Sequence, residues 1–192
     1  MLAQEMNHRM RNVLALVQSV VGQTLRAGEA PALARTKIGE RIAAIGRAQD
    51  VLTQSSWSGA PLSSTAMSVL SAHAEPHRFR ISGDELHLDS PRTLAMALAL
   101  NELAVNAVKH GALSDKLGHV EIDWSVDAAQ RFSFVWTELG GPAPAGQPTR
   151  SGFGSTLLGR AVSSYFDGET RMDFRPAGLV FTLTGSASGA AQ

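Results

Sequence analysis

The sequence predicts an α+β fold, in which an N-terminal helical hairpin precedes an α/β sandwich. Two apolar stripes with helical spacing within the first 57 residues predict the hairpin. Apolar residues that alternate with period two after residue 119 predict the sheet of the sandwich. With 192 residues, the chain is long enough for one large domain or two small ones. We expect two, residues 1–57 and residues 58–192.

The hairpin is predicted from spacing alone. Apolar side chains in residues 6–21 recur every three or four positions, as on one face of a long amphipathic helix. The pattern lapses at Gly28 and Pro31, and a second stripe runs through residues 38–52. One partner helix covers each stripe only in part, so two hairpins would complete a four-helix bundle. We therefore expect a homodimer formed through the hairpin.

The second domain is predicted as short strands interleaved with helices. Gly59–Ser64, rich in small residues and Pro, predicts a linker. Ser90 followed by Pro91 predicts an N-terminal cap at Ser90 and a helix from Pro91 to about His110. Period-two alternation and turn residues predict strands over 79–82, 86–88, 120–126, 132–136, 170–174 and 179–184, a Gly- and Pro-rich loop over 140–151, and a helix over 156–166.

Composition excludes several functional classes. The formal net charge is zero, because 17 Lys and Arg balance 17 Asp and Glu, so no overall positive field attracts nucleic acid or an acidic membrane. The absence of Cys excludes disulfides, thiol catalysis and thiolate metal sites. The most apolar run, residues 94–108, is interrupted by polar residues and is shorter than the ~20 residues of a membrane span. We expect a cytoplasmic chain with no nucleic-acid partner and no membrane segment.

Three polar residues interrupt the long apolar helix. Glu102, Asn106 and Lys109 recur at i, i+4 and i+7 and therefore share one helical face. Two interpretations stay open from spacing alone. The face could be a solvated polar seam, or it could belong to a Mg²⁺–nucleotide site in which Asn106 gives an oxygen to the metal and Lys109 faces phosphate.

Two further elements favour the nucleotide site. Gly152 and Gly154 open a predicted helix after a Gly-rich loop, where free N–H groups and the helix dipole can hold phosphates. Glu138 ends a predicted strand on its inward face, and the glycines that follow would let it accept a hydrogen bond from an adenine amino group. Alone, Glu138 could be an edge carboxylate in a turn. The three elements together, in this order, indicate nucleotide binding.

These segments resemble a known family. N101-E-L-A-V-N-A-V-K-H-G-A-L-S114, W136-T-E-L-G-G-P142 and G152-F-G-S-T-L-L158 are similar to the N-box, the W-x-E motif and the second G-box of HWE-type sensor histidine kinases, relatives of the HisKA_2 group. Upstream, H8-R-M-R-N12 resembles their phosphoacceptor box. The resemblance extends over nearly the whole chain, from about residue 2 to residue 184.

The resemblance implies an ATP-dependent protein histidine kinase that autophosphorylates and passes the phosphoryl group to an aspartate of a response-regulator receiver domain. It implies that residues 1–57 are the dimerisation and phosphotransfer hairpin and that residues 58–192 are an ATP-binding domain of the histidine kinase and gyrase type. The cofactors would be ATP and Mg²⁺, with Asn106 as the metal ligand. Implied catalytic residues are His8, Asn12 and Glu102; implied nucleotide-binding residues are Asn106, Lys109, His110, Glu138, Gly140, Pro142, Gly152, Phe153, Gly154, Ser155, Thr156 and Leu157.

Three positions of these motifs need separate comment. The N-box His of the family is Asn101 here. His8 lies opposite the apolar stripe of its helix, so a solvent-facing imidazole could attack a phosphate there. Asn12 shares that face one turn later, either to orient a phosphoryl group or as a plain surface amide. Alternatives to the kinase are a non-catalytic phosphotransfer scaffold and a Bergerat-fold serine/threonine kinase, which would not need His8.

Overall fold

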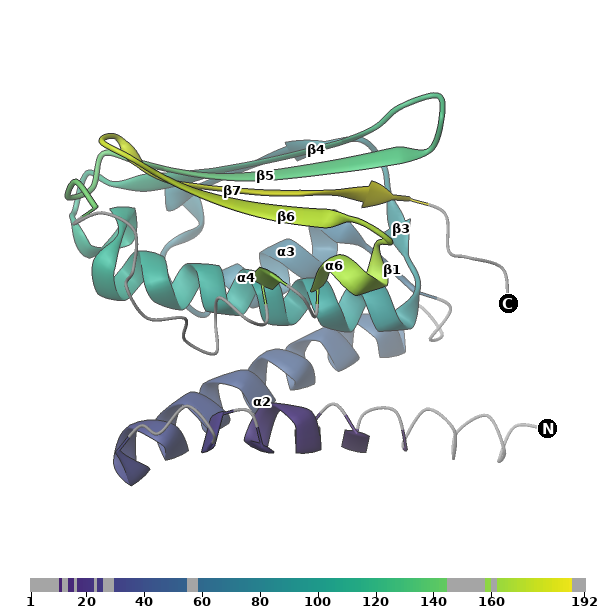
Figure 1. Ribbon diagram of the computed structural model, residues 1–192, viewed down its shortest axis with the longest axis horizontal. Helices are drawn as coiled ribbons and strands as arrows, with labels where there is room; N and C mark the ends of the chain where they lie inside the picture. The colour runs from purple at the N-terminus through teal and green to yellow at the C-terminus, as the bar shows by residue number, and fades with distance from the viewer. Residues whose placement is uncertain are drawn as a thin grey trace. The chain divides into compact units, whose positions relative to one another are not determined.

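Figure 1 shows the computed structural model of the chain, which describes residues 11, 14, 15, 17–22, 24, 25, 30–54, 59–144, 158, 159 and 162–187. The chain divides into two compact units, Met1–Ala43 and Ala44–Gln192. The division falls inside helix α2 (Pro31–Gln54), which is continuous across it. The expected domain boundary between residues 57 and 58 stays a prediction.

The first unit is helical at every described position except Ala30. Helix α2 begins at Pro31, which suits a first turn because it has no N–H to leave unpaired. Thr24 and Arg41 are almost fully buried, and Nη1 of Arg41 donates a hydrogen bond of 2.6 Å to Oγ1 of Thr24. The Thr24 hydroxyl donates in turn to the carbonyl of Val20 at 2.6 Å. A satisfied polar pair therefore lies within the apolar stripe of the unit.

The second unit contains a five-stranded sheet with the order β2-β4-β5-β7-β6. Neighbouring strands are antiparallel except β2 and β4, which are parallel. All five coincide with predicted strands. Their bounds are β2 Phe79–Gly83, β4 His119–Val126, β5 Arg131–Leu139, β6 Glu169–Arg175 and β7 Gly178–Ser186.

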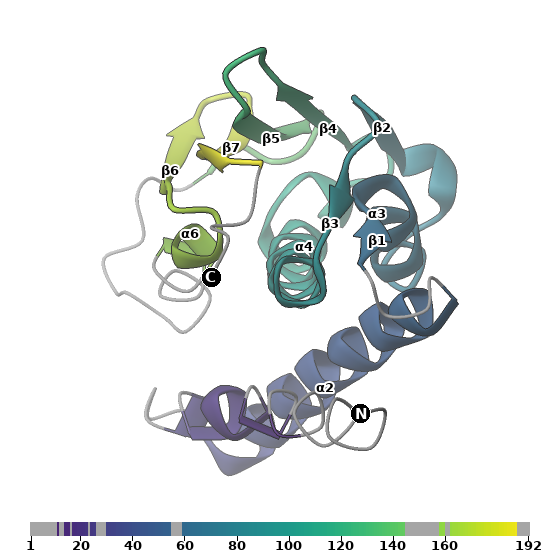
Figure 2. The ribbon, with the colours of Figure 1, turned by 90° about the vertical axis from the view of Figure 1, so that its right-hand side faces the viewer.

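Helices cover one face of this sheet. Helices α3 (Leu62–Leu70), α4 (Ser90–His110) and α6 (Val162–Tyr165) lie side by side below the strands in Figure 2. The strand residues that face them are almost wholly buried: Val120, Ile122, Trp124, Phe132, Phe134, Trp136, Phe181 and Leu183. Alternate residues on the same strands point to the other face, where Figure 1 shows no helix from the described part of the chain. One-sided burial explains the period-two pattern in the sequence.

Helix α4 is the central helix of this layer, and local residues fix both of its ends. The carboxylate of Asp89 accepts a hydrogen bond of 2.9 Å from the N–H of Arg92, and Pro91 occupies the first turn. The predicted cap at Ser90 is therefore wrong by one residue, because the Asp89 carboxylate suits the positive end of the helix better than a hydroxyl does. The helix ends at His110, as predicted, and Gly111 is its C-terminal cap. Among the described helices, none is both long enough and apolar enough to cross a membrane.

Gly59–Ser64 does not form the predicted linker. Ala60–Pro61 is strand β1, which pairs antiparallel with β3 (His87–Leu88), and α3 begins at the fully buried Leu62. A Cβ at Gly59 would lie 2.1 Å from the carbonyl oxygen of Leu88. The small residues therefore serve close packing between backbones. Composition alone does not separate this arrangement from a flexible linker.

A buried arginine connects the start of α4 to two other elements. Arg92 is 4% exposed, and its Nε donates to the carbonyl of Tyr165 at 2.7 Å. Its Nη1 donates to the carbonyl of Ala187 at 3.0 Å, and the guanidinium lies 5.4 Å from the ring centroid of Phe166. Tyr165 is the last residue of α6, and Ala187 follows β7. One side chain therefore fastens both to α4.

We expect Arg92→Met to lower the free energy of unfolding by about 2–4 kcal/mol, because it leaves buried carbonyls without donors. Urea unfolding followed by tryptophan fluorescence measures this. Arg80→Met is the control, since Arg80 is an exposed side chain that pairs with Glu121 at 2.8 Å, and we expect a change within about 0.5 kcal/mol. An equally small effect of Arg92→Met would contradict the assignment.

Candidate functional site

The polar face of α4 changes from buried to exposed toward the C-terminal end of the helix. Glu102 is 7% exposed, whereas Asn106, Lys109 and His110 are exposed. A seam that only solvated the helix would expose all of its members, so the burial of Glu102 argues against that interpretation. The exposed amide and amine remain accessible to a ligand at the end of the helix.

Asn101, which stands where the family has His, is 1% exposed and binds two other elements of the same unit. Its Oδ1 accepts a hydrogen bond from Nη2 of Arg47 at 3.4 Å and lies 3.1 Å from Nε2 of His73. Arginine can only donate, so the amide oxygen must face it, and His73 must carry a proton on Nε2. Nδ2 of Asn101 has no partner among the described residues. The amide oxygen of Asn101 thus accepts hydrogen bonds from both Arg47 and His73. A neutral imidazole has one acceptor nitrogen with a single lone pair, so a histidine at this position could not accept both.

Glu138 lies on the inward face at the end of β5, as predicted, and is 3% exposed. Its Oε2 accepts a hydrogen bond of 2.8 Å from the N–H of Ala112, and its Oε1 accepts one of 3.3 Å from Nε1 of Trp136. Burial raises the pKa of this carboxyl, and the two N–H donors oppose that rise. A carboxylate offers about four lone-pair positions. Two therefore remain for a ligand donor.

Three glycines allow close packing around Glu138 and Ala112, because a Cβ at any of these positions would clash with a neighbouring atom. A Cβ at Gly111 would lie 1.8 Å from Oε2 of Glu138, and one at Gly178 would lie 2.2 Å from its carbonyl oxygen. A Cβ at Gly141 would lie 2.3 Å from Cα of Ala112. The end of α4 therefore packs against the carboxylate of Glu138, and the start of β7 packs against its main chain.

The structure brings some of the predicted site residues together. The N–H of Gly111 bonds to the carbonyl of Asn106 at 3.1 Å, which connects the exposed face of α4 to the surroundings of Glu138. Gly140 has φ +72° and follows β5 directly, and Pro142 is exposed in the same segment. The other predicted residues lie outside the described residues: His8, Asn12, Gly152, Phe153, Gly154, Ser155, Thr156 and Leu157.

Sequence reasoning missed the partners of Glu138. Ala112 is 26 positions away in the chain, and a main-chain N–H donor leaves no trace in residue type. Gly111 was interpretable only as a helix terminator, whereas it also makes room for the carboxylate. Trp136 is fully buried, and its Nε1 donates a hydrogen bond to Glu138.

The donors and acceptors of this site suit a nucleotide with a hydrated Mg²⁺. Mg²⁺ keeps several waters and phosphate oxygens and needs only one or two oxygens from the protein, such as the exposed amide of Asn106. The ammonium of Lys109 suits a phosphate. The free lone pairs of Glu138 suit an amino group on a base. The chemistry of these residues therefore fits both cofactors.

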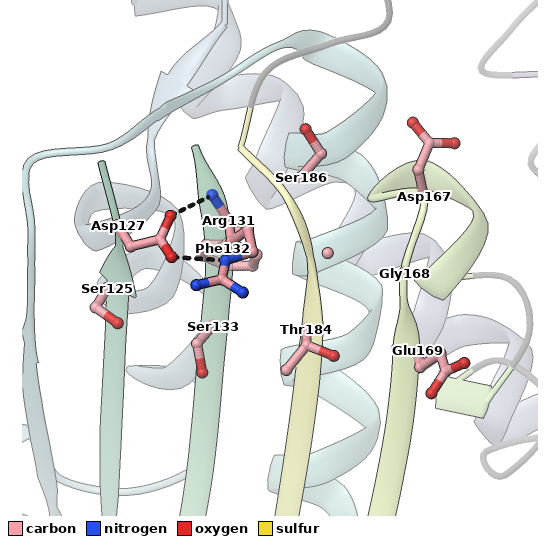
Figure 3. Close-up of a pocket in the computed structure, with 11 residues that line it drawn as sticks. Ser125, Asp127, Arg131, Phe132, Ser133, Asp167, Gly168, Glu169, Thr184 and Ser186 are labelled. Atoms are coloured by element: carbon pink, nitrogen blue, oxygen red, sulfur yellow. Dashed lines mark hydrogen bonds and ion pairs between the residues drawn. The ribbon is translucent and has the colours of Figure 1, made fainter. Parts of the chain in front are cut away.

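Figure 3 shows a separate depression of about 640 Å³. The strand register places it at the end of β4 and β5 opposite to Glu138, because Val126 pairs with Phe132 and Val120 pairs with Glu138. It includes Asp127 and Arg131, whose ion pair of 2.7 Å closes the β4–β5 turn. Hydrogen bonds from the backbone and side chain of Arg131 lower the pKa of Asp127. None of the predicted site residues lines this depression, so the polar groups of the motifs define a different place in the fold.

Comparisons with known proteins agree with the motifs. Residues 5–85 match the HWE histidine kinase family. The chain is 37% identical over 188 residues to the blue-light-activated histidine kinase of Brucella anthropi, and 34% identical over 188 residues to that of Brucella ovis. Each match covers 95% of this chain and 38% of the relative. The chain therefore spans well under half the length of these relatives.

Solved structures show the same fold. The blue-light activated histidine kinase of Erythrobacter litoralis EL346 superposes with a TM-score of 0.75 at 14% identity, over 96% of this chain and 60% of that chain. The histidine kinase domain of the same protein gives a TM-score of 0.60 at 13% identity, over 90% and 94%. The fold is thus a histidine kinase fold, with helices preceding an α/β sandwich of the ATP-binding type. This fold agrees with the match of residues 5–85 to the HWE histidine kinase family and with the similarity to histidine kinases along 95% of this chain.

We expect Gly111→Ala to weaken nucleotide binding and to cost about 1–3 kcal/mol of unfolding free energy, because the new Cβ would lie against the Glu138 carboxylate and the main chain of Ala107 and must displace one of them. Calorimetric titration with Mg²⁺–ATP and urea unfolding measure the two effects. Gly39→Ala is the control: nothing lies within 4 Å of a Cβ there, so this helical position should gain about 0.5–1 kcal/mol. Equal tolerance of both substitutions would contradict the close packing at Glu138.

Glu138 should also give the unfolding free energy a characteristic pH dependence. Burial raises the folded pKa above its ordinary value of 4.5, so the folded state holds the proton more tightly than the unfolded state. The resulting stabilisation is fully present below the unfolded pKa and is lost as pH rises through the folded pKa. Relative to Glu138→Gln, which does not titrate, the native protein should therefore lose stability as pH rises above about 4.5. Urea unfolding of both proteins across this range measures the difference. A native protein that gains stability relative to Glu138→Gln as pH rises would refute the prediction.

Proposed function

We propose that this chain is the catalytic core of a sensor histidine kinase that transfers the γ-phosphoryl group of ATP to His8 and then to an aspartate of a response-regulator receiver domain. The observation that carries the proposal is the Glu138 carboxylate, buried at the end of β5 and joined through Gly111 and Ala112 to the helix that presents Asn106. The match of residues 5–85 to the HWE histidine kinase family and the 37% identity to a blue-light-activated histidine kinase over 188 residues support it.

The proposed chemistry is positioning followed by in-line transfer. Glu138 accepts a hydrogen bond from the adenine amino group, Lys109 faces the phosphates, and Asn106 supplies an oxygen to Mg²⁺, which when bound neutralises phosphate charge. A ring nitrogen of His8 attacks the γ-phosphorus, the bond to the β-phosphate oxygen breaks, and ADP leaves. Asn12, one turn further along, orients the phosphoryl group.

The hairpin supports the proposed assembly. In the first unit, apolar side chains stay exposed on both helical segments: Leu14 (55%), Leu25 (61%), Leu33 (45%) and Ile42 (41%). Exposed apolar groups at this density suit a partner helix pair, so we propose a homodimer that buries them in a four-helix bundle. The receiver domain would then approach His8 from outside the bundle. Because the proposed reaction consumes ATP, we propose that it takes place in the cytoplasm.

Incubation with γ-labelled ATP and Mg²⁺ tests the proposal with three proteins: the native chain, His8→Ala and Asn106→Ala. We expect acid-labile label on the native chain alone. His8→Ala should keep native affinity for Mg²⁺–ATP, because the nucleophile does not bind the nucleotide. Asn106→Ala should lose at least about tenfold in Mg²⁺–ATP affinity, the scale of one ligand to a charged group.

Other results would identify the alternatives. Acid-stable label that persists in His8→Ala would indicate a serine or threonine kinase. A native chain that neither binds ATP nor incorporates label, yet accepts a phosphoryl group from a phosphorylated receiver domain, would indicate a non-catalytic phosphotransfer scaffold. Undiminished Mg²⁺–ATP binding by Asn106→Ala would move the metal site elsewhere.

A further inference from the structure

Arg78 is a half-buried arginine that belongs to none of the family's motifs. It ends the short 3₁₀ helix Pro76–Arg78, immediately before β2. Its Nε donates to the carbonyl of Gly118 at 2.9 Å, and its Nη1 donates to that of Leu113 at 3.3 Å. Its Nη2 donates to the carbonyls of Gly118 and Asp115. Three nitrogens of one guanidinium thus bind three carbonyls of a single loop.

That loop, residues 111–118, joins α4 to β4 and carries the donor to Glu138. Ala112 gives its N–H to Oε2 of Glu138 at 2.8 Å. A Cβ at Gly118 would lie 1.8 Å from the carbonyl oxygen of Ala112, so the two ends of the loop touch. Arg78 and Glu138 therefore hold the same turn, one by its carbonyls and the other by an N–H.

We propose that Arg78 is a positioning residue of the nucleotide site: by holding residues 111–118 it fixes the Ala112 N–H against Glu138, and so fixes the carboxylate that meets the adenine. This proposal rests on the proposed function for the role of Glu138. Its own content, that Arg78 sets the turn, rests on the four hydrogen bonds and can be measured without nucleotide.

The arrangement requires arginine and not simply a positive charge. A guanidinium is planar and presents donors in a fixed fork, whereas an ammonium is a point donor that cannot reach three separated carbonyls together. Lysine at position 78 should therefore behave like an uncharged side chain. Arg80 provides the matched control, because it lies two residues further on, is exposed, and pairs with Glu121 across β2 and β4.

The experiment compares the native chain with Arg78→Met, Arg78→Lys and Arg80→Met. Amide hydrogen exchange without nucleotide comes first. We expect the Ala112 amide to be protected in the native chain and in Arg80→Met, and to exchange at least about tenfold faster in both Arg78 variants. Mg²⁺–ATP affinity should fall by about tenfold or more in both Arg78 variants and stay within about twofold in Arg80→Met.

A pH series supplies a readout that a general loss of stability would not produce. The Ala112 N–H lowers the pKa of Glu138, so its loss should let that pKa rise further. Mg²⁺–ATP binding weakens on acidification when Glu138 takes up a proton. In the Arg78 variants this weakening should therefore begin at a higher pH than in the native chain, whereas Arg80→Met should follow the native curve.

The outcomes separate the two proposals. A native chain that binds no nucleotide refutes the proposed function, while the exchange measurement still decides whether Arg78 holds the turn. Rapid exchange of the Ala112 amide in the native chain overturns the role of Arg78. This measurement does not depend on whether a variant folds. The role of Arg78 is also overturned if either Arg78 variant keeps both the native ATP affinity and the native protection of the Ala112 amide. Full rescue by Arg78→Lys overturns it as well.

Discussion

The hydrogen bond between the Ala112 N–H and the buried Glu138 carboxylate is the contact on which the site depends. It joins the turn after α4 to the last residues of β5. The carboxylate bears a desolvation cost, visible as a raised pKa, and the N–H donors offset part of it. An uncharged acceptor would avoid this cost but would offer fewer lone pairs to a ligand.

Two arginines organise the ends of α4 by the same means. Arg92 near its start and Arg78 beside the turn at its end both direct their guanidinium donors to main-chain carbonyls. Carbonyls at the ends of helices and in turns lack intrahelical partners, and a fork of N–H groups satisfies several of them at once. The central helix is thereby fixed at both ends by side chains outside the family's motifs.

The sequence was sufficient wherever one-sided burial leaves a periodic signature. Alternation along β4 and β5 predicts both strands and the inward direction of Glu138, and helical spacing predicts α2 and α4. The sequence was insufficient where small residues are compatible both with a flexible linker and with close packing of backbones. Gly59–Ser64 has the composition of a linker but includes β1 and the start of α3. Contacts between distant segments, such as Asn101 with His73, carry no periodic signal.

The bonds of Arg92 have a consequence for how the chain is made. Its partner Ala187 lies 95 positions later, and Tyr165 lies 73 positions later. During synthesis, the apolar faces of α4 emerge from the ribosome well before the residues that fasten them exist. The contacts of Arg92 can therefore form only after the last strand has been made, so the apolar side chains of α4 lack these partners while the later strands are synthesised.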